Sequence, residues 1–217
     1  MDSSPILLVT GFEPFAGELV NPSWLVARAL DGERVAGARI VAARLPCAFG
    51  AALDGALARS APQLVLALGQ AGGRSDFSIE RVAINVDDAR IPDNAGASPV
   101  DEPVVGGAPA AYFASLPIKA MVAALLESGF PASVSQTAGT FVCNHVFFGL
   151  MHRLQGRPGV RGGFMHLPLL PEQAARRPAT PHLPSLPLAT LVAGTRIALA
   201  TAFEQAQDIR RSGGSVG

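Results

Sequence analysis

The chain has 217 residues, and its 17 basic residues (Lys and Arg) are balanced by 17 acidic ones (Asp and Glu). Without a basic surplus there is no net attraction to a phosphate backbone, which disfavours a nucleic-acid-binding protein. The two cysteines are too few for a disulfide scaffold and fit a reducing cytoplasm. No apolar run approaches the roughly 20 residues that span a bilayer. The amino-terminal segment has no basic region before its short apolar run, so we expect neither a membrane segment nor a secretion signal.

Short apolar runs alternate with helix-like segments along the chain. This alternation predicts a single α/β domain over residues 1–209, a three-layer α/β/α sandwich around a twisted, mostly parallel central sheet. Strands are predicted at 6–10, 38–45, 63–69, 81–86, 132–136 and 161–168. Helices are predicted at 22–30, 49–60, 118–129, 143–154 and 188–205, the first capped by Asn21. The tail 210–217, rich in Gly and Ser, is expected to be disordered.

Residues 87–111 are rich in Pro, Gly and Asp and show no sustained period. A stretch this long without regular structure is uncommon in a compact domain and usually serves as a lid or a binding loop. The alternative is a surface excursion without a function.

Cys143 stands in "TFVCNHVFF", where a strand or turn is predicted to lead into the first turn of a helix. A free cysteine is most often a small buried hydrophobe. A metal site shared with His145 is a second interpretation, although Cys-x-His lacks the paired ligand clusters of structural zinc sites. Catalysis is the third, because unpaired N–H groups and the helix dipole favour a thiolate and can bind an oxyanion.

A nucleophilic cysteine needs a base from another part of the fold. His166 lies near the end of the predicted strand 161–168, and in parallel α/β sheets the strand ends open onto the ligand crevice. The alternative is a core histidine with satisfied hydrogen bonds. His145 and His152 fall on the helix of the cysteine, and His182 lies in a polar loop.

A carboxylate is the usual group that orients such a histidine. Glu80 lies between Ile79 and Val82, in a position poorly suited to mere solubility. We therefore rank it first for this role, and a further set of acidic residues competes with it: Asp76, Asp87 and Asp88.

Aromatic residues surround the candidate nucleophile in the sequence. Phe12 and Phe15 follow the first strand, and Phe141 lies two residues before the thiol. They could line an apolar pocket or plug the edge of the sheet. A non-catalytic binding module would keep such a pocket without needing Cys143. A nucleotide enzyme would instead use "LVLALGQAGGR", which resembles a phosphate loop but lacks the dinucleotide spacing and a Walker lysine.

Six long motifs occur in one order: "VTGFEPFAGELVNPSW", "LGQAGGR", "ERVAINVDDARIPDN", "VDEPVVGGAPAAYFASLPIK", "AGTFVCNHVFFGLMH" and "RGGFMHLPLLPEQ". Together they resemble the pyroglutamyl peptidase I (pyrrolidone carboxyl peptidase) family of cysteine peptidases over nearly the whole chain. The resemblance implies that Cys143 is the nucleophile, His166 its base and Glu80 the orienting acid. The implied reaction is hydrolysis of the amide bond after an N-terminal pyroglutamyl residue of a peptide, with neither a metal nor a cofactor.

The resemblance also implies a set of residues around the substrate. The pyrrolidone ring would meet apolar side chains from two parts of the chain: Phe12, Phe15, Phe141 and Val142. Gln70 would lie near the polar edge of the ring and Arg90 beside the reacting carbonyl. Cys47 stands where the family commonly has threonine, which affects the shape of the pocket. Members of the family are often dimers or tetramers, so a homo-oligomer is expected.

Overall fold

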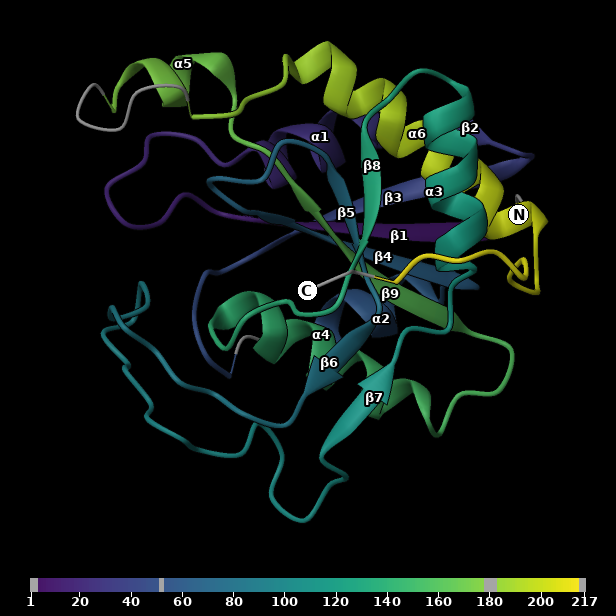
Figure 1. Cartoon of the computed structure of the whole chain (residues 1–217). Coiled ribbons are helices and arrows are strands. Elements are labelled where there is room, and N and C mark those ends of the chain that lie inside the picture. Colours follow the sequence, from purple (N-terminus) through teal and green to yellow (C-terminus); the bar gives the residue numbers. More distant parts are fainter. Residues whose placement is uncertain (1–3, 51–52, 178–182, 215–217) are drawn as a thin grey trace.

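The computed structural model describes residues 4–50, 53–177 and 183–214 (Figure 1). Seven strands form one sheet in the order β2-β3-β1-β4-β9-β5-β8. Their bounds are β1 (Ile6–Phe12), β2 (Arg34–Val35), β3 (Ala38–Leu45), β4 (Leu64–Gln70), β5 (Phe77–Glu80), β8 (Ala132–Ser135) and β9 (Arg161–Leu167). A separate two-stranded sheet contains β6 (Val82–Ile84) and β7 (Ala111–Phe113).

The middle of the large sheet is parallel. Strands β3, β1, β4 and β9 run in one direction, and β8 is parallel to β5. The direction reverses between β2 and β3 and between β9 and β5. Four of the six neighbouring pairs are therefore parallel, which confirms the predicted mostly parallel sheet.

Helices cover both faces of this sheet (Figure 1). One face carries α1 (Pro22–Leu30), α3 (Ile118–Glu127) and α6 (Leu188–Glu204), and the other carries α2 (Asp54–Ser60) and α4 (Val142–Leu154). The short α5 (Pro171–Ala175) follows β9. This arrangement confirms the predicted three-layer sandwich. In the described part of the chain, no helix is both long and apolar enough to cross a membrane.

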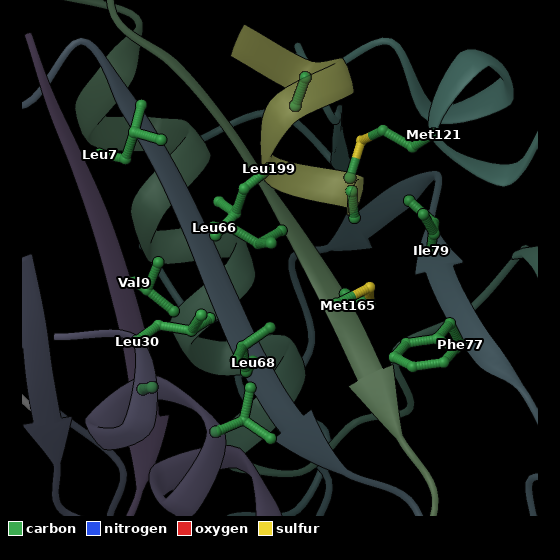
Figure 2. Packing of buried hydrophobic residues seen from close by; sticks show 14 of the residues in the cluster. Leu7, Val9, Leu30, Leu66, Leu68, Phe77, Ile79, Met121, Met165 and Leu199 are labelled. Carbon is green, nitrogen blue, oxygen red and sulfur yellow. The ribbon is translucent and has the colours of Figure 1, made fainter. Parts of the chain in front are cut away.

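Alternating side chains of the central strands build two separate cores. Leu66 and Leu68 of β4 and Met165 of β9 pack under the first set of helices, near Met121 and Leu199 (Figure 2). The residues between them face the other way. Ala67 of β4 and Phe164 of β9 pack with Phe147 and Leu150 of α4.

The first helix begins as the sequence predicts. Asn21 has an extended backbone, and its side-chain oxygen accepts the N–H of Ser23 at 3.1 Å. Pro22 occupies the first helical position, where its missing N–H costs nothing.

The predicted strand 81–86 corresponds to β6, which leaves the large sheet and pairs with β7. The strand before it, β5, was not predicted. Its apolar residues Phe77 and Ile79 pack in one core, while Ser78 and Glu80 are buried on the other face. Burial of these polar residues hides the usual apolar signal of a strand. The predicted helix 49–60 begins as α2 at Asp54, and residues 51–52 lie outside the described residues.

Between Asp87 and Ala110 the chain has no helix or strand, as predicted, apart from one bridge between Asp87 and Glu102. The loop is nevertheless held in place. The Asp93 carboxylate accepts the backbone N–H groups of Phe49, Ala95 and Ala97 at 2.7–2.8 Å. The segment from 210, for which disorder is expected, is described as far as Gly214.

Candidate active site

Cys143 is the second residue of α4, and Phe141 is the N-cap with an extended backbone and no capping side-chain bond. The turn-to-helix position predicted for the thiol is therefore confirmed. The backbone N–H groups of a first helical turn have no acceptor within the helix. Cys143 as a whole residue is partly exposed.

The thiol lies against the middle of the sheet. A Cβ atom added to Gly69 of β4 would come within 2.9 Å of Cys143 Sγ and 2.7 Å of the Phe164 ring. Gly69 is the register partner of His166 on the adjacent strand β9. Because Gly69 has no side chain, the Cys143 sulfur can lie against β4, the strand that pairs with β9 beside His166.

His166 is bound to the predicted carboxylate. Its Nδ1 lies 2.7 Å from Glu80 Oε1, and the two residues are 4% and 0% exposed. The strand pairing places Ser78 opposite His166, so Glu80 reaches the ring diagonally from two residues further along β5. If Nδ1 donates to the carboxylate, Nε2 is left as an acceptor. The structure therefore brings Cys143, His166 and Glu80 onto one face of the sheet.

Burial controls the protonation of this group. It lowers the pKa of His166 below its usual 6.5, although the hydrogen bond to Glu80 acts in the opposite direction. Burial also raises the pKa of the Cys143 thiol above its usual 9.0, and the charge of Glu80 adds to this. Burial thus opposes the expected preference for thiolate at the helix N-terminus and favours the neutral forms of thiol and imidazole.

Arg74 completes the surroundings of the carboxylate. Its Nη1 donates to Glu80 Oε1 at 2.7 Å, and its Nη2 donates to the Thr137 carbonyl at 2.9 Å. The motif "LGQAGGR" is part of the family resemblance, but the sequence analysis did not single out its last residue, Arg74. Only the folded chain shows that this arginine meets a buried acid.

Aromatic rings gather at the N-terminus of α4. Phe141 lies 6.2 Å from Phe15 and 5.4 Å, edge to face, from Phe49. Phe12 is only 2% exposed, and its ring packs on Phe164 at 6.4 Å. Val142 is also buried. The sequence analysis missed Phe49, although it noted Cys47 two residues earlier.

A cavity of about 680 Å³ lies beside these rings and is lined by Asp88, Arg90, Ile91, Gly139, Thr140 and Phe141. Arg90 is exposed and has no hydrogen bond or ion pair with another described residue. Its guanidinium is therefore available at the N-terminal end of α4.

Gln70, the last residue of β4, is hydrogen-bonded to α5. Its Oε1 accepts a hydrogen bond from Gln173 Nε2 of α5 at 3.0 Å. Successive residues of a strand face opposite sides, and the preceding Gly69 faces Cys143. The Gln70 amide is thus turned away from the face that carries the thiol.

The other histidines are engaged elsewhere. His145 uses both ring nitrogens, since Nδ1 lies 2.7 Å from Asp87 Oδ2 and Nε2 accepts the Gly50 N–H at 2.9 Å. This arrangement leaves no nitrogen for a metal shared with Cys143. His152 pairs with the Tyr112 hydroxyl at 2.9 Å. His182 lies outside the described residues.

The competing acids do not meet His166. Asp76 accepts the Ser78 hydroxyl at 2.7 Å, and Asp87 pairs with His145. The phosphate-loop interpretation is wrong for a topological reason. The glycine-containing segment 71–76 joins β4 to the strand β5, so it is not followed by a helix N-terminus that could bind phosphate.

The chain is similar to known proteins over nearly its whole length. The family model described as pyroglutamyl peptidase matches residues 6–205. A pyrrolidone-carboxylate peptidase of Cupriavidus taiwanensis is 62% identical over 217 residues, covering 98% of this chain and 99% of the relative. Its counterpart in Klebsiella pneumoniae is 58% identical over 212 residues, covering 96% of this chain and 98% of the relative. Pyroglutamyl peptidase I from Bacillus amyloliquefaciens, a crystal structure, has a TM-score of 0.90 at 44% identity, covering 95% of this chain and all (100%) of that one.

Proposed function

This chain belongs to the pyroglutamyl peptidase family of cysteine peptidases, and on that premise we propose that it removes N-terminal pyroglutamyl residues from peptides through a Cys143-His166-Glu80 triad. One observation carries the assignment of the triad. His166 contacts Glu80 at 2.7 Å and lies on β9 beside Gly69 of β4, and the Cys143 sulfur packs against Gly69.

The reaction divides into two steps around a thioacyl enzyme. His166 Nε2 takes the thiol proton as Cys143 Sγ attacks the pyroglutamyl carbonyl carbon. The imidazolium then gives this proton to the leaving amine as the amide bond breaks. In the second step His166 deprotonates a water that attacks the thioester, and the thiol leaves with that proton. Glu80 holds the ring and stabilises the imidazolium.

The negative oxygen of the tetrahedral intermediate needs donors. The backbone N–H of Cys143, in the first turn of α4, and the exposed Arg90 guanidinium are the proposed ones. One such donor typically lowers the barrier by about 3 kcal/mol.

Selectivity follows from the chemistry of the cyclised terminus. A pyroglutamyl group is a neutral lactam, so an apolar pocket built from Phe12, Phe15, Phe141 and Val142 can bury it. An ordinary amino terminus would lose its hydration there, which costs several kcal/mol unless an acid pairs with it. A prolyl ring lacks the lactam carbonyl and would leave a buried donor unmatched. The expected role of Gln70 at the polar edge of the ring stays a prediction.

The decisive experiment is release of a fluorescent amine from a pyroglutamyl amide, with the prolyl amide as control. We expect cleavage of the lactam substrate alone, its loss after iodoacetamide, and its loss in a folded Cys143→Ala variant. No cleavage by the reduced, folded protein would refute the proposed reaction. If the parent protein does not turn over the substrate and Cys143→Ala still binds it, the non-catalytic binding module would be favoured.

Location and assembly are further parts of the proposal. We propose a cytoplasmic protein, since Cys47 and Cys143 are both free thiols. We also propose a dimer or tetramer, because exposed apolar side chains such as Phe113 (71%) and Val100 (66%) suit a subunit interface. Light scattering on the purified protein measures the number of subunits directly, and a monomer would contradict this part.

A further inference from the structure

Glu80 is a fully buried carboxylate, with 0% exposure. A charge taken out of water is costly unless it is paired and hydrogen-bonded. Oε1 is the atom in both of its polar contacts, since it lies 2.7 Å from His166 Nδ1 and accepts a hydrogen bond from Arg74 Nη1. Oε2 is also buried and has no hydrogen-bond partner among the described residues. The carboxylate therefore depends on a single oxygen for all of its contacts.

Arg74 supplies the permanent charge at this site. Among the described residues it is the only Lys or Arg within ion-pair distance of Glu80. Its side chain is 27% exposed, so the guanidinium keeps part of its hydration while it meets the buried acid. The other nitrogen binds the Thr137 carbonyl, in the loop that leads into α4 and Cys143.

We propose that Arg74 is a positioning residue that keeps Glu80 ionised and thereby holds His166 in the tautomer that can accept the thiol proton. This inference rests on the proposed function. Without the guanidinium charge, Glu80 would be a carboxylic acid that keeps its proton, and its O–H would donate a hydrogen bond to His166 Nδ1. The ring would then carry its own proton on Nε2 and could not act as the base for Cys143.

The groups that face Glu80 are few. Arg74 comes from the loop between β4 and β5, His166 from β9 and Cys143 from α4. On the neighbouring strand β8, the register partner of Glu80 is the uncharged Ser135. A change in the pH profile after substitution of Arg74 therefore reports on this small set.

The first test compares Arg74→Gln, Arg74→Lys and the control Arg81→Gln. Arg81 is a matched control because it binds Gln136 and Gly213 without touching the carboxylate. We expect Arg74→Gln to lower kcat about 10- to 100-fold, as loss of a supporting partner typically does, and to move the acid limb of kcat/KM to higher pH. Arg74→Lys should keep the wild-type limb, and Arg81→Gln should keep both rate and limb. If the acid limb of kcat/KM in Arg74→Gln stays at the wild-type pH, the proposal is wrong.

A second test asks whether Arg74 acts through Glu80. If it does, the double variant Arg74→Gln/Glu80→Gln has the same kcat as Glu80→Gln alone, whereas independent effects would multiply. If Arg74→Gln does not fold, the same comparison of single and double variants is made on the free energy of unfolding. Glu80→Gln removes the buried charge and should restore folding to the double variant. A double variant as unstable as Arg74→Gln overturns the proposal.

The two hypotheses fail in different ways. No cleavage of the pyroglutamyl amide by the wild-type protein refutes the proposed function. If Glu80→Gln impairs cleavage but Arg74→Gln cleaves as fast as Arg81→Gln, only the role of Arg74 is refuted. Ring ¹⁵N shifts of His166 give a separate reading, with Nδ1–H in the wild type and Nε2–H in Arg74→Gln.

Discussion

Gly69 is the residue on which the contact between nucleophile and sheet depends. Gly69→Ala would place a Cβ less than 3.0 Å from both the Phe164 ring and Cys143 Sγ. We expect a loss of about 1–3 kcal/mol in the free energy of unfolding, as overpacking of a core typically gives, together with a fall in kcat. Urea denaturation and steady-state kinetics measure the two effects.

Gly72→Ala is the matched control for this prediction. An added Cβ at Gly72 would meet Arg177 at 3.6 Å and Leu169 at 3.8 Å, which are ordinary contacts. Stability within about 0.5 kcal/mol of the wild type is expected. Full activity in Gly69→Ala would contradict the packing of the sulfur on this residue.

The two cysteines should differ in reactivity. Cys47 is 4% exposed, and burial, with the nearby Glu13 and Asp93, raises the pKa of its thiol to about 12. Because Cys143 is partly exposed whereas Cys47 is buried, iodoacetamide should label Cys143 alone, and its rate should rise about tenfold per pH unit near neutrality because the thiolate is the nucleophile. Mass spectrometry of the native protein gives the site and the rate. A rate independent of pH below neutrality would instead indicate a preformed thiolate–imidazolium pair.

The residues of the proposed triad could be chosen from the sequence because each is chemically conspicuous. A cysteine before an apolar helix, a histidine at the end of a strand and a glutamate among apolar neighbours are visible as local patterns. Arg74, Phe49 and Gly69 are not, because their importance comes from contacts with residues distant in the chain. The amide of Gln70 shows the same limit, since its orientation depends on Gln173.

At the scale of elements, α3 shows how a distant residue can complete a helix. Its N-cap is Pro117, which offers no side-chain acceptor. The Asp208 carboxylate instead accepts the backbone N–H groups of Lys119 and Ala120 at 2.9–3.1 Å. We expect Asp208→Ala to lower the free energy of unfolding by about 1 kcal/mol, as loss of a cap does. Asp208→Asn, which keeps an acceptor, should lose less.

Thermal or urea unfolding checks this cap, with Glu204→Ala as a control at the nearby, exposed end of α6. A loss in Glu204→Ala equal to that in Asp208→Ala would show that charge in this region, rather than the cap, is responsible.

The long elements of the fold could be predicted because each has its own pattern. Strand β4 is a continuous apolar run buried on both faces, and α1 has an N-cap and a proline at its start. The short strands β2 and β7 could not be predicted in this way. They have two and three residues, which are too few to show a period, and they exist through pairing with β3 and β6. The direction of β5 likewise depends on its neighbours.

At the scale of the whole molecule, burial of a neutral histidine links stability to pH. The pKa of His166 is lowered in the folded protein. Between that lower value and the unfolded value near 6.5, the unfolded chain binds a proton that the folded protein does not. Acidification through this window therefore favours unfolding.

The urea midpoint at about pH 7.5 and about pH 5.5 tests this linkage. We expect the wild type to lose more stability than His166→Gln between the two conditions. Equal losses in the two proteins would show that other groups dominate the acid response.

Strand β9 is the last of the described strands along the chain, yet it lies between β4 and β5. While the protein is being synthesised, β4 and β5 each present an open edge until residues 161–167 have left the ribosome. Open edges of this kind invite pairing with other chains. The same strand carries His166, the proposed base, so a nascent chain that already holds Cys143 lacks it. On the proposed mechanism, hydrolytic competence and protection from misassembly are therefore acquired together, by one late insertion.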